Sequence, residues 1–238
     1  VNIIYFKFMD ETKKFISISD LFAKSFEFYK IRAITIVCLM LFNLLIIVAM
    51  IPLGIIFALT AFLTGGFTSA GIVFNLILGF ITVILVGVAV LVSLIIGLWS
   101  CVAAMFAVKG GTGIKESLKL AWPELASYFW ISLLVGLATL AGLILLIIPG
   151  IIFSIWFSFA LWVFVAEGMK GRIALSRSKQ LVSGYWWGVF VRFFLIGVIS
   201  WLISSIPMVG GIINFVLVMP FSLIYGYLMY QSLKTLKQ

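Results

Sequence analysis

The side chains that could do chemistry in this chain are few, and the most unusual ones lie within or beside long uncharged stretches. Glu167 and Arg192 stand at the end of one such stretch and early in the next, while Asn43, Asn75 and Asn214 lie inside others. If these stretches cross a bilayer, a charge at its centre costs about 2.5–3.5 kcal/mol, so charges there pair or stay near the surface. Either Glu167 and Arg192 approach one another and pin two helical hairpins together, or each reaches the headgroups independently.

The three asparagines also allow two interpretations. Amide side chains within membrane spans could line a pathway for a solute. They also form hydrogen bonds between helices, each contributing roughly 0.6 kcal/mol. We favour this interhelical role, and we treat all five polar residues as structural or functional intramembrane positions.

Residues suited to catalysis or metal binding are scarce. The chain contains no histidine, which is the commonest general base and the commonest metal ligand. The segment Lys109-Gly110-Gly111-Thr112-Gly113 lacks the GK[ST] ending of a nucleotide-binding loop, and we interpret it as the lead-in to a helix. The sequence also lacks a nucleophile elbow, a metal cluster and paired carboxylates. We therefore expect a protein that is not an enzyme and holds no metal and no cofactor.

The composition explains why these polar residues are so isolated. Hydrophobic residues make up 65% of the 238 positions and charged residues only 10%, whereas a soluble domain carries about 25% charge. So little charge cannot cover a water-soluble core. The net charge of +9 could suggest nucleic acid, but the cations lie in short segments between apolar runs, as in cytoplasmic loops of membrane proteins. The sequence therefore predicts an all-α membrane protein whose basic residues face anionic lipid headgroups.

The apolar runs predict about six transmembrane helices, arranged as three helical hairpins. A crossing helix needs about 20 apolar residues. Breaks at Gly65-Gly66, at Pro149-Gly150 and at 207–211 separate the two arms of each hairpin, and Pro52 interrupts the first arm. The runs cover Ala33 to Leu63, Thr64 to Val108, Tyr128 to Ile148, Ile151 to Ala166, Trp186 to Ile206 and Ile212 to Met229.

The cations all belong to one side of these hairpins. They lie before the first crossing, in the segments between hairpins or after the last crossing, and Arg192 lies just inside the fifth crossing. The three connections at the opposite side carry no charge. Because cytoplasmic loops hold the excess of Lys and Arg, we expect both termini in the cytoplasm and the protein in the cell (inner or plasma) membrane. Trp122, Trp130, Trp186 and Trp187 cluster at this charged boundary, where an indole keeps its N–H wet and its ring in hydrocarbon.

The hairpins also form an internal repeat. Ile-Pro followed closely by Gly occurs three times, at Pro52, Pro149 and Pro207, and a small residue stands 27, 28 and 29 positions before these prolines. An apolar residue precedes each small one by three positions, giving the pairs Phe22/Ser25, Leu118/Ala121 and Leu175/Ser178. Helical periodicity around each pair predicts an amphipathic helix at the cytoplasmic face before each hairpin.

We therefore divide the single transmembrane domain, residues 1–238, into pseudo-repeats of about 17–108, 112–168 and 172–233. The segment Ser17-Ile18-Ser19-Asp20 fits the capping box that would start the first amphipathic helix. The first repeat carries a long apolar insertion between Pro52 and Lys109. This insertion could be a long helix, a hairpin at the outer face or a re-entrant segment.

The stretch from Pro149 to Phe194 resembles a broad group of prokaryotic polytopic membrane proteins, which includes the membrane domain attached to some glycerophosphodiester phosphodiesterases. The matching residues are Pro149-Gly150, Glu167, Ala174-Leu175, Ser178, Leu181-Val182 and Gly184. They form a proline-glycine turn, a span ending near an acid, and an Ala-Leu-x-x-Ser-x-x-Leu-Val-x-Gly segment. The resemblance implies the membrane fold and carries no catalytic activity, because the acids and histidines of a phosphodiesterase site are absent.

These observations favour a multi-pass scaffold, accessory or lipid-interacting protein, whose partners are membrane lipids and a possible protein partner or second copy. The alternative is a transporter or permease for an apolar or amphipathic solute, since transporters often combine internal repeats with helices broken by Gly and Pro. An enzyme acting on lipids is a third reading, which the lack of histidine and of paired acids disfavours.

Overall fold

The computed structural model describes residues 15–63 and 69–237, which form helices joined by short turns, without a β-strand in these ranges. The predicted all-α class is confirmed. The helices are α2 (Ile18–Leu63), α3 (Ser69–Gly110), α4 (Ile114–Ala121), the 3₁₀ turn η1 (Trp122–Glu124), α5 (Leu125–Leu145), α6 (Ile147–Phe157), α7 (Ala160–Glu167), α8 (Gly171–Val182), α9 (Trp186–Ser204), α10 (Gly210–Ile213), the π-helical turn η2 (Asn214–Val218) and α11 (Met219–Leu236).

Five helical stretches in the described ranges are long and apolar enough to cross a membrane. They are Gly79–Gly110, Ile114–Leu145, Ile147–Glu167, Trp186–Ser204 and Gly210–Leu236. The chain thus has the construction of a helical membrane protein. A sixth crossing within α2 stays a prediction.

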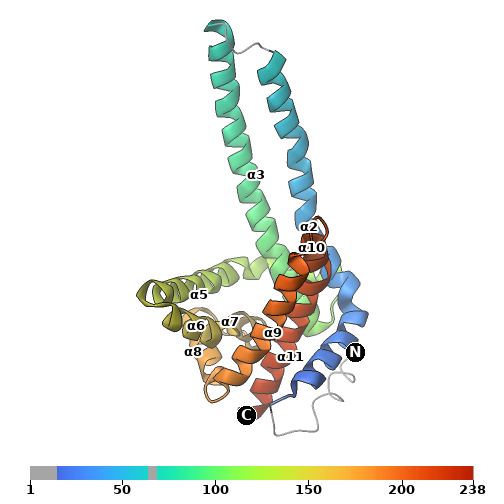
Figure 1. The fold of residues 1–238 in the computed structure, drawn as a ribbon, viewed down its shortest axis with the longest axis vertical. Helices are drawn as coiled ribbons and strands as arrows, with labels where there is room; N and C mark the ends of the chain where they lie inside the picture. Colours follow the sequence, from blue (N-terminus) through green and yellow to red (C-terminus); the bar gives the residue numbers. More distant parts are fainter. Residues whose placement is uncertain (1–14, 64–68, 238) are drawn as a thin grey trace.

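The segment predicted as the first repeat forms two very long helices. The α2 helix has 46 residues and α3 has 42, so they measure about 69 and 63 Å at 1.5 Å per residue. They pack side by side and project well beyond the other helices (Figure 1). The insertion between Pro52 and Lys109 forms the end of α2 and nearly all of α3, and the break predicted at Gly65-Gly66 lies outside the described residues.

The start of α2 agrees with the sequence, but its course does not. The predicted cap is present, because the Ser17 hydroxyl accepts the backbone N–H of Asp20 at 3.1 Å. The helix then runs through Pro52 without a break, so the segment predicted to be amphipathic and the predicted first span form one continuous element. A proline removes only one helical hydrogen bond, and helices in apolar surroundings tolerate that loss when neighbouring groups compensate.

The second hairpin turns three residues before the position predicted from Pro149-Gly150. The chain reverses at Leu146, whose backbone is extended, and Pro149 lies in the first turn of α6, where its missing N–H breaks no bond. Glycines let the two arms touch: a Cβ built on Gly142 would lie 2.9 Å from the Gly150 Cα. In Figure 1, this α5–α6 hairpin extends sideways from the foot of α3.

The helices of the predicted third hairpin, α9 and α10 to α11, stand beside the foot of the long pair. Helix α11 packs against α2, and α9 and α11 rise together to α10 at their far end (Figure 1). The turn between α9 and α10 covers 205–209, two residues before the break predicted at 207–211, and it holds Met208 in the left-handed region at φ 64° and almost fully exposed.

The buried core lies at the feet of these helices, close to the charged residues. The largest fully buried side chains include Tyr225, Tyr230 and Phe159, and they pack near the last turns of α3. The small residues of the predicted repeat, Ser25, Ala121 and Ser178, are each fully buried. Elsewhere the helices expose large apolar side chains in numbers that water would not tolerate.

We expect Gly142→Ala to destabilise the protein by about 1–3 kcal/mol, because the added methyl would push the backbones of α5 and α6 apart. Equilibrium unfolding in mixed micelles measures this change. Gly136→Ala on the same helix is the matched control, since its Cβ would meet no atom within 4 Å. Equal stability of the two variants would show that the hairpin arms do not touch at Gly142.

Candidate functional site

The strongest concentration of charge surrounds Glu167, the last residue of α7. Its side chain is 9% exposed, and its carboxylate accepts a hydrogen bond from the Tyr230 hydroxyl at 2.6 Å. The Arg177 Nε donates to the other carboxylate oxygen at 3.3 Å, and the Lys234 Nζ lies 3.5 Å from the first. Residues from α7, α8 and α11 are thereby joined at one carboxylate.

A further cation, Lys109 at the end of α3, reaches the same place. Its Nζ donates to the Val165 carbonyl oxygen at 2.7 Å, in the last turn of α7. That turn ends at Gly168, which takes the left-handed conformation and caps the helix through the Phe164 carbonyl. Cations at a helix C-terminus are favourable because the carbonyl ends carry partial negative charge. We call Lys109, Glu167, Arg177, Tyr230 and Lys234 the Glu167 cluster.

The Glu167 cluster joins several helices through one acid. Its carboxylate is shared by three neighbouring groups, Tyr230, Arg177 and Lys234, and three cations accompany the acid. Such an arrangement holds four helices, α3, α7, α8 and α11, at their charged ends. Within the described ranges, no group of three or more Cys, Asp or Glu side chains is placed to hold a metal ion.

A second polar contact lies where α6 breaks into α7. The helix loses its regular hydrogen bonds at 158–159, and Ser178 of α8 replaces them. Its hydroxyl donates to the Trp156 carbonyl at 2.7 Å and accepts the Phe159 N–H at 3.2 Å. Ser178 is fully buried, and without it two backbone groups would lack partners.

The structure gives Arg192 and Glu167 different partners, so the ion pair considered from the sequence is not formed. Arg192 is 8% exposed, and its guanidinium donates to the Gly188 carbonyl at 2.8 Å and to the Ile16 carbonyl. It also lies 4.0 Å from the centroid of the Phe15 ring. Arg192 therefore fastens the segment before α2 to α9.

Asn214 connects two helices of the third hairpin. Its amide oxygen accepts the Ser200 hydroxyl at 3.0 Å, and its amide nitrogen donates to Ser204 at 2.7 Å. This geometry agrees with the interhelical interpretation. Asn43 and Asn75 lie on α2 and α3, but their side chains are outside the described part of the structure.

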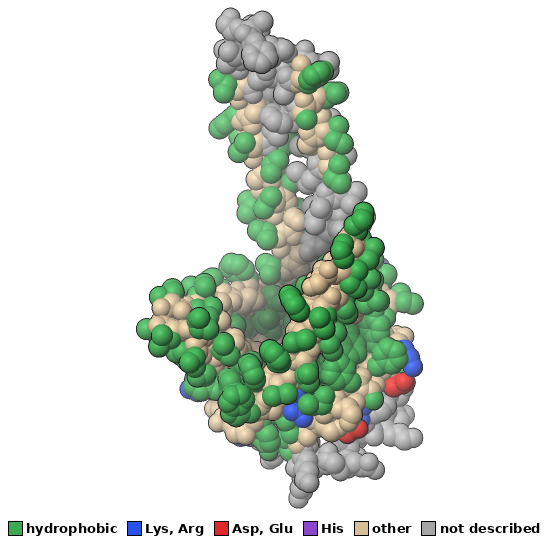
Figure 2. All heavy atoms as spheres, viewed as in Figure 1, with side chains coloured by type: hydrophobic (Ala, Val, Ile, Leu, Met, Phe, Trp, Pro, Cys, Tyr) green, Lys and Arg blue, Asp and Glu red, His purple; other side chains and the backbone are tan. Residues whose placement is uncertain are grey.

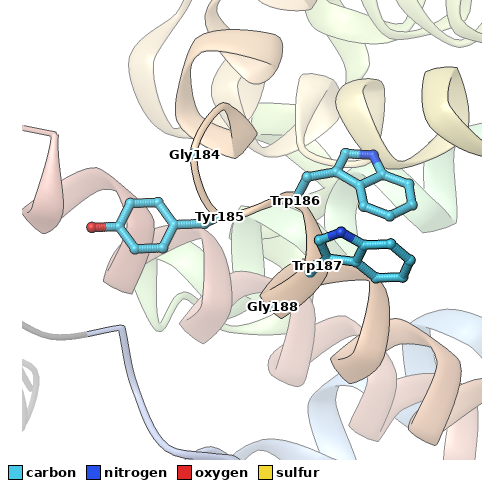
Figure 3. A pocket seen from close by; sticks show the side chains of 5 residues that line it. All are labelled: Gly184, Tyr185, Trp186, Trp187 and Gly188. Carbon is cyan, nitrogen blue, oxygen red and sulfur yellow. The ribbon is translucent and has the colours of Figure 1, made fainter.

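A shallow pocket opens at the start of α9. From the sequence, Trp186 and Trp187 were expected at the charged boundary and Gly184 belongs to the resembling segment, but the pocket itself was not predicted. It has a volume of about 370 Å³ and is lined by Gly184, Tyr185, Trp186, Trp187 and Gly188. The two indoles lie together on one side, and the Tyr185 ring points away from them (Figure 3). Gly184 has a φ of 89°, which a side chain would disfavour, so this glycine sets the turn that leads into the pocket.

Comparison with protein-family models, curated proteins and solved structures finds no match to this chain.

We expect Glu167→Gln to lower the free energy of unfolding by about 1–3 kcal/mol, because Arg177 and Lys234 lose the charge that they share. Equilibrium unfolding in mixed micelles measures it. Glu27→Gln is the control, since the Glu27–Lys30 pair is more than half exposed and should contribute under about 0.5 kcal/mol. Indistinguishable losses in the two variants would contradict a structural role for the Glu167 cluster.

We also expect Ser178→Ala to cost about 2 kcal/mol, since the Trp156 carbonyl and the Phe159 N–H would both be left unpaired. Ser154→Ala on α6 should change stability by less than about 0.5 kcal/mol, because the Ser154 hydroxyl only supplements its own helix at Ile151. The same unfolding assay compares them. A Ser178→Ala protein as stable as Ser154→Ala would mean that the break needs no side-chain support.

Proposed function

We propose that this chain is a non-catalytic, multi-pass scaffold or accessory protein of the cell membrane, which interacts with anionic lipids and has both termini in the cytoplasm. The observation that carries the proposal is the separation of charge from apolar surface. Lys, Arg, Asp and Glu gather around the feet of the helices, while apolar side chains cover the projecting parts on the face that Figure 2 shows. This is the distribution expected of helices in hydrocarbon with one charged interface.

The Glu167 cluster supports a scaffolding role over a catalytic one. Its acid is committed to three donors, and its cations are committed to Glu167 or to the end of α7. These contacts fix the relative positions of α3, α7, α8 and α11. A rigid charged end suits a protein that presents a surface to lipids or to another protein.

The outward cations of two short helices support an interaction with anionic lipids. Helix α4 buries Ser117 and Ala121 and exposes Lys115 and Lys119. Helix α8 likewise buries four residues, Ser178 among them, and exposes Arg172 and Lys179. A Lys or Arg near an anionic surface contributes about 1 kcal/mol of attraction, so several together favour anionic headgroups.

The resemblance of 149–194 to a group of polytopic membrane proteins also enters the proposal. Three residues of that pattern have specific structural tasks, which supports treating it as a fold motif. Gly150 permits the contact of α5 with α6, Ser178 bridges the helix break, and Gly184 takes a positive φ. On this reading, the pattern encodes the packing of the second and third repeats.

The proposed orientation predicts which positions a membrane-impermeant maleimide can reach. In a protein whose Cys38 and Cys101 are replaced by alanine, Met208→Cys should be labelled on intact cells, because Met208 is 97% exposed at the end remote from the cations. Lys115→Cys should be labelled only after the cells are permeabilised. Labelling of both positions from the same side would contradict the topology.

The lipid preference is measured with spin-labelled lipids in vesicles that contain the full chain. We expect anionic lipids to associate at least about twofold more strongly than zwitterionic ones, with the preference falling as salt rises. Replacing Lys115 and Lys119 by glutamine should reduce it, whereas Met208→Gln at the other end should not. A wild-type protein without this preference would refute the proposed lipid interaction.

A further inference from the structure

The two longest helices are too long for a single bilayer. The hydrocarbon core is about 30 Å thick, and helix α9, whose 19 residues measure about 28 Å, matches it. Helix α3 measures about 63 Å, and the long pair continues well beyond α10 (Figure 1). Hydrocarbon can therefore cover only part of α2 and α3.

The feet of the two helices determine where they enter the bilayer. The Arg32 guanidinium of α2 donates to the Gly111 carbonyl at 2.6 Å, next to the end of α3, so both helices start at the same level. Transmembrane helices tilt by up to about 40°, and at that angle about 26 residues fit in the hydrocarbon. Counted from Ala33 and from Val108, residues 59–63 of α2 and 69–82 of α3 lie beyond it. We call these two segments the extension.

The extension has an apolar surface although it lies beyond the hydrocarbon. The chain carries no charged residue from 33 to 108. Six large apolar side chains among those described in the extension are exposed to between 47% and 82%: Leu59, Phe62, Leu76, Ile77, Phe80 and Ile81. Together they expose roughly 800 Å², about the area that one partner contributes to a stable protein interface. Apolar patches of this size outside hydrocarbon mark interaction sites.

A glycine in the extension has open space where another helix can approach. Glycine destabilises the interior of a helix, and in membrane proteins it is favoured where two helices touch closely. Gly142 makes such a contact inside this chain, with Gly150. A Cβ built on Gly79 meets no atom within 4 Å in the described part of the chain, and Phe80 beside it is exposed. Gly79 is therefore open to a helix from outside the chain.

We infer that the extension pairs with the extension of a second copy of this chain, about a two-fold axis along the membrane normal. The inference rests on the proposed multi-pass topology and deepens it, because it names the partner. All copies in one membrane have the same orientation, so their extensions project on the same side, at the same height, and meet side by side. The occupant of this surface must be uncharged and reach equally far beyond the hydrocarbon, and a second copy meets both requirements.

Subunit counting by photobleaching tests the inference in vesicles that contain the full chain at increasing protein density. Each copy carries one fluorophore on Lys237→Cys, in the protein whose Cys38 and Cys101 are replaced by alanine. We expect mostly two bleaching steps once the density rises. Gly79→Leu should weaken the pair about tenfold, because the new side chain meets nothing in its own chain and blocks the approach of the second copy.

Two further variants separate the interface from the fold. Phe80→Gln should also weaken the pair, and the loss of its ring leaves no cavity in its own chain because Phe80 is 70% exposed. Gly136→Leu on α5 is the matched control and should pair like the wild type, since a Cβ on Gly136 also meets no described atom within 4 Å and Gly136 lies outside the extension. Unfolding midpoints in mixed micelles check that all three variants fold.

Three results would overturn the pairing. One is a single bleaching step at every density, another is wild-type pairing in both Gly79→Leu and Phe80→Gln, and the third is equal weakening in Gly136→Leu. Single steps together with clustering of added empty vesicles would show that the extension enters an apposed membrane instead. The maleimide assay at Met208 and Lys115 is independent of these outcomes. If its labelling follows the proposed topology while the protein bleaches in single steps, only the pairing fails; if the labelling contradicts that topology, the general proposal fails.

Discussion

A backbone amide or carbonyl that faces hydrocarbon has no water to bind, and this constraint decides where the helices of this chain can break. The long helices α2 and α3 satisfy it internally over 46 and 42 residues, apart from the one hydrogen bond that Pro52 removes. The break between α6 and α7 satisfies it through a hydroxyl from another helix, because Ser178 supplies both a donor and an acceptor. The position of α8 is thus tied to an irregularity in the span beside it.

A similar constraint decides where charged side chains can be buried, because each of them also needs partners in place of water. Glu167 can be buried because Tyr230, Arg177 and Lys234 surround its carboxylate, and Lys109 completes the group at the end of α7. Arg192 is buried with two carbonyls and an aromatic face instead of an acid. Both arrangements lie at the feet of the helices and join segments far apart in sequence. The packing of this protein is therefore determined at the charged end. The remaining helical surface exposes large apolar side chains to its surroundings.

Local signals allowed part of this structure to be predicted. Run length and composition predicted the helical class, and Ser17 marked the start of α2, because caps and apolar periods depend on residues a few positions apart. Pro149 misplaced a turn, since a proline in the first helical turn costs nothing. The partners of Glu167 could not be predicted: Lys234 is 67 positions away, and several cations near the boundary were equally plausible. The sequence marked Ser178 only as the small residue of a repeat. Its two hydrogen bonds to the backbone could not be predicted, because they depend on the break between α6 and α7.

Accessibility of spin labels along α9 tests most directly whether hydrocarbon surrounds these helices. Nitroxides placed singly from Val191 to Met208 are compared for collision with oxygen, which concentrates in the bilayer, and with a water-soluble nickel chelate. The account predicts high oxygen and low nickel accessibility at exposed mid-helix positions such as Val198, with nickel accessibility rising at Met208. Nickel accessibility at Val198 as high as at Met208 would contradict it, because the apolar surface would then be facing water.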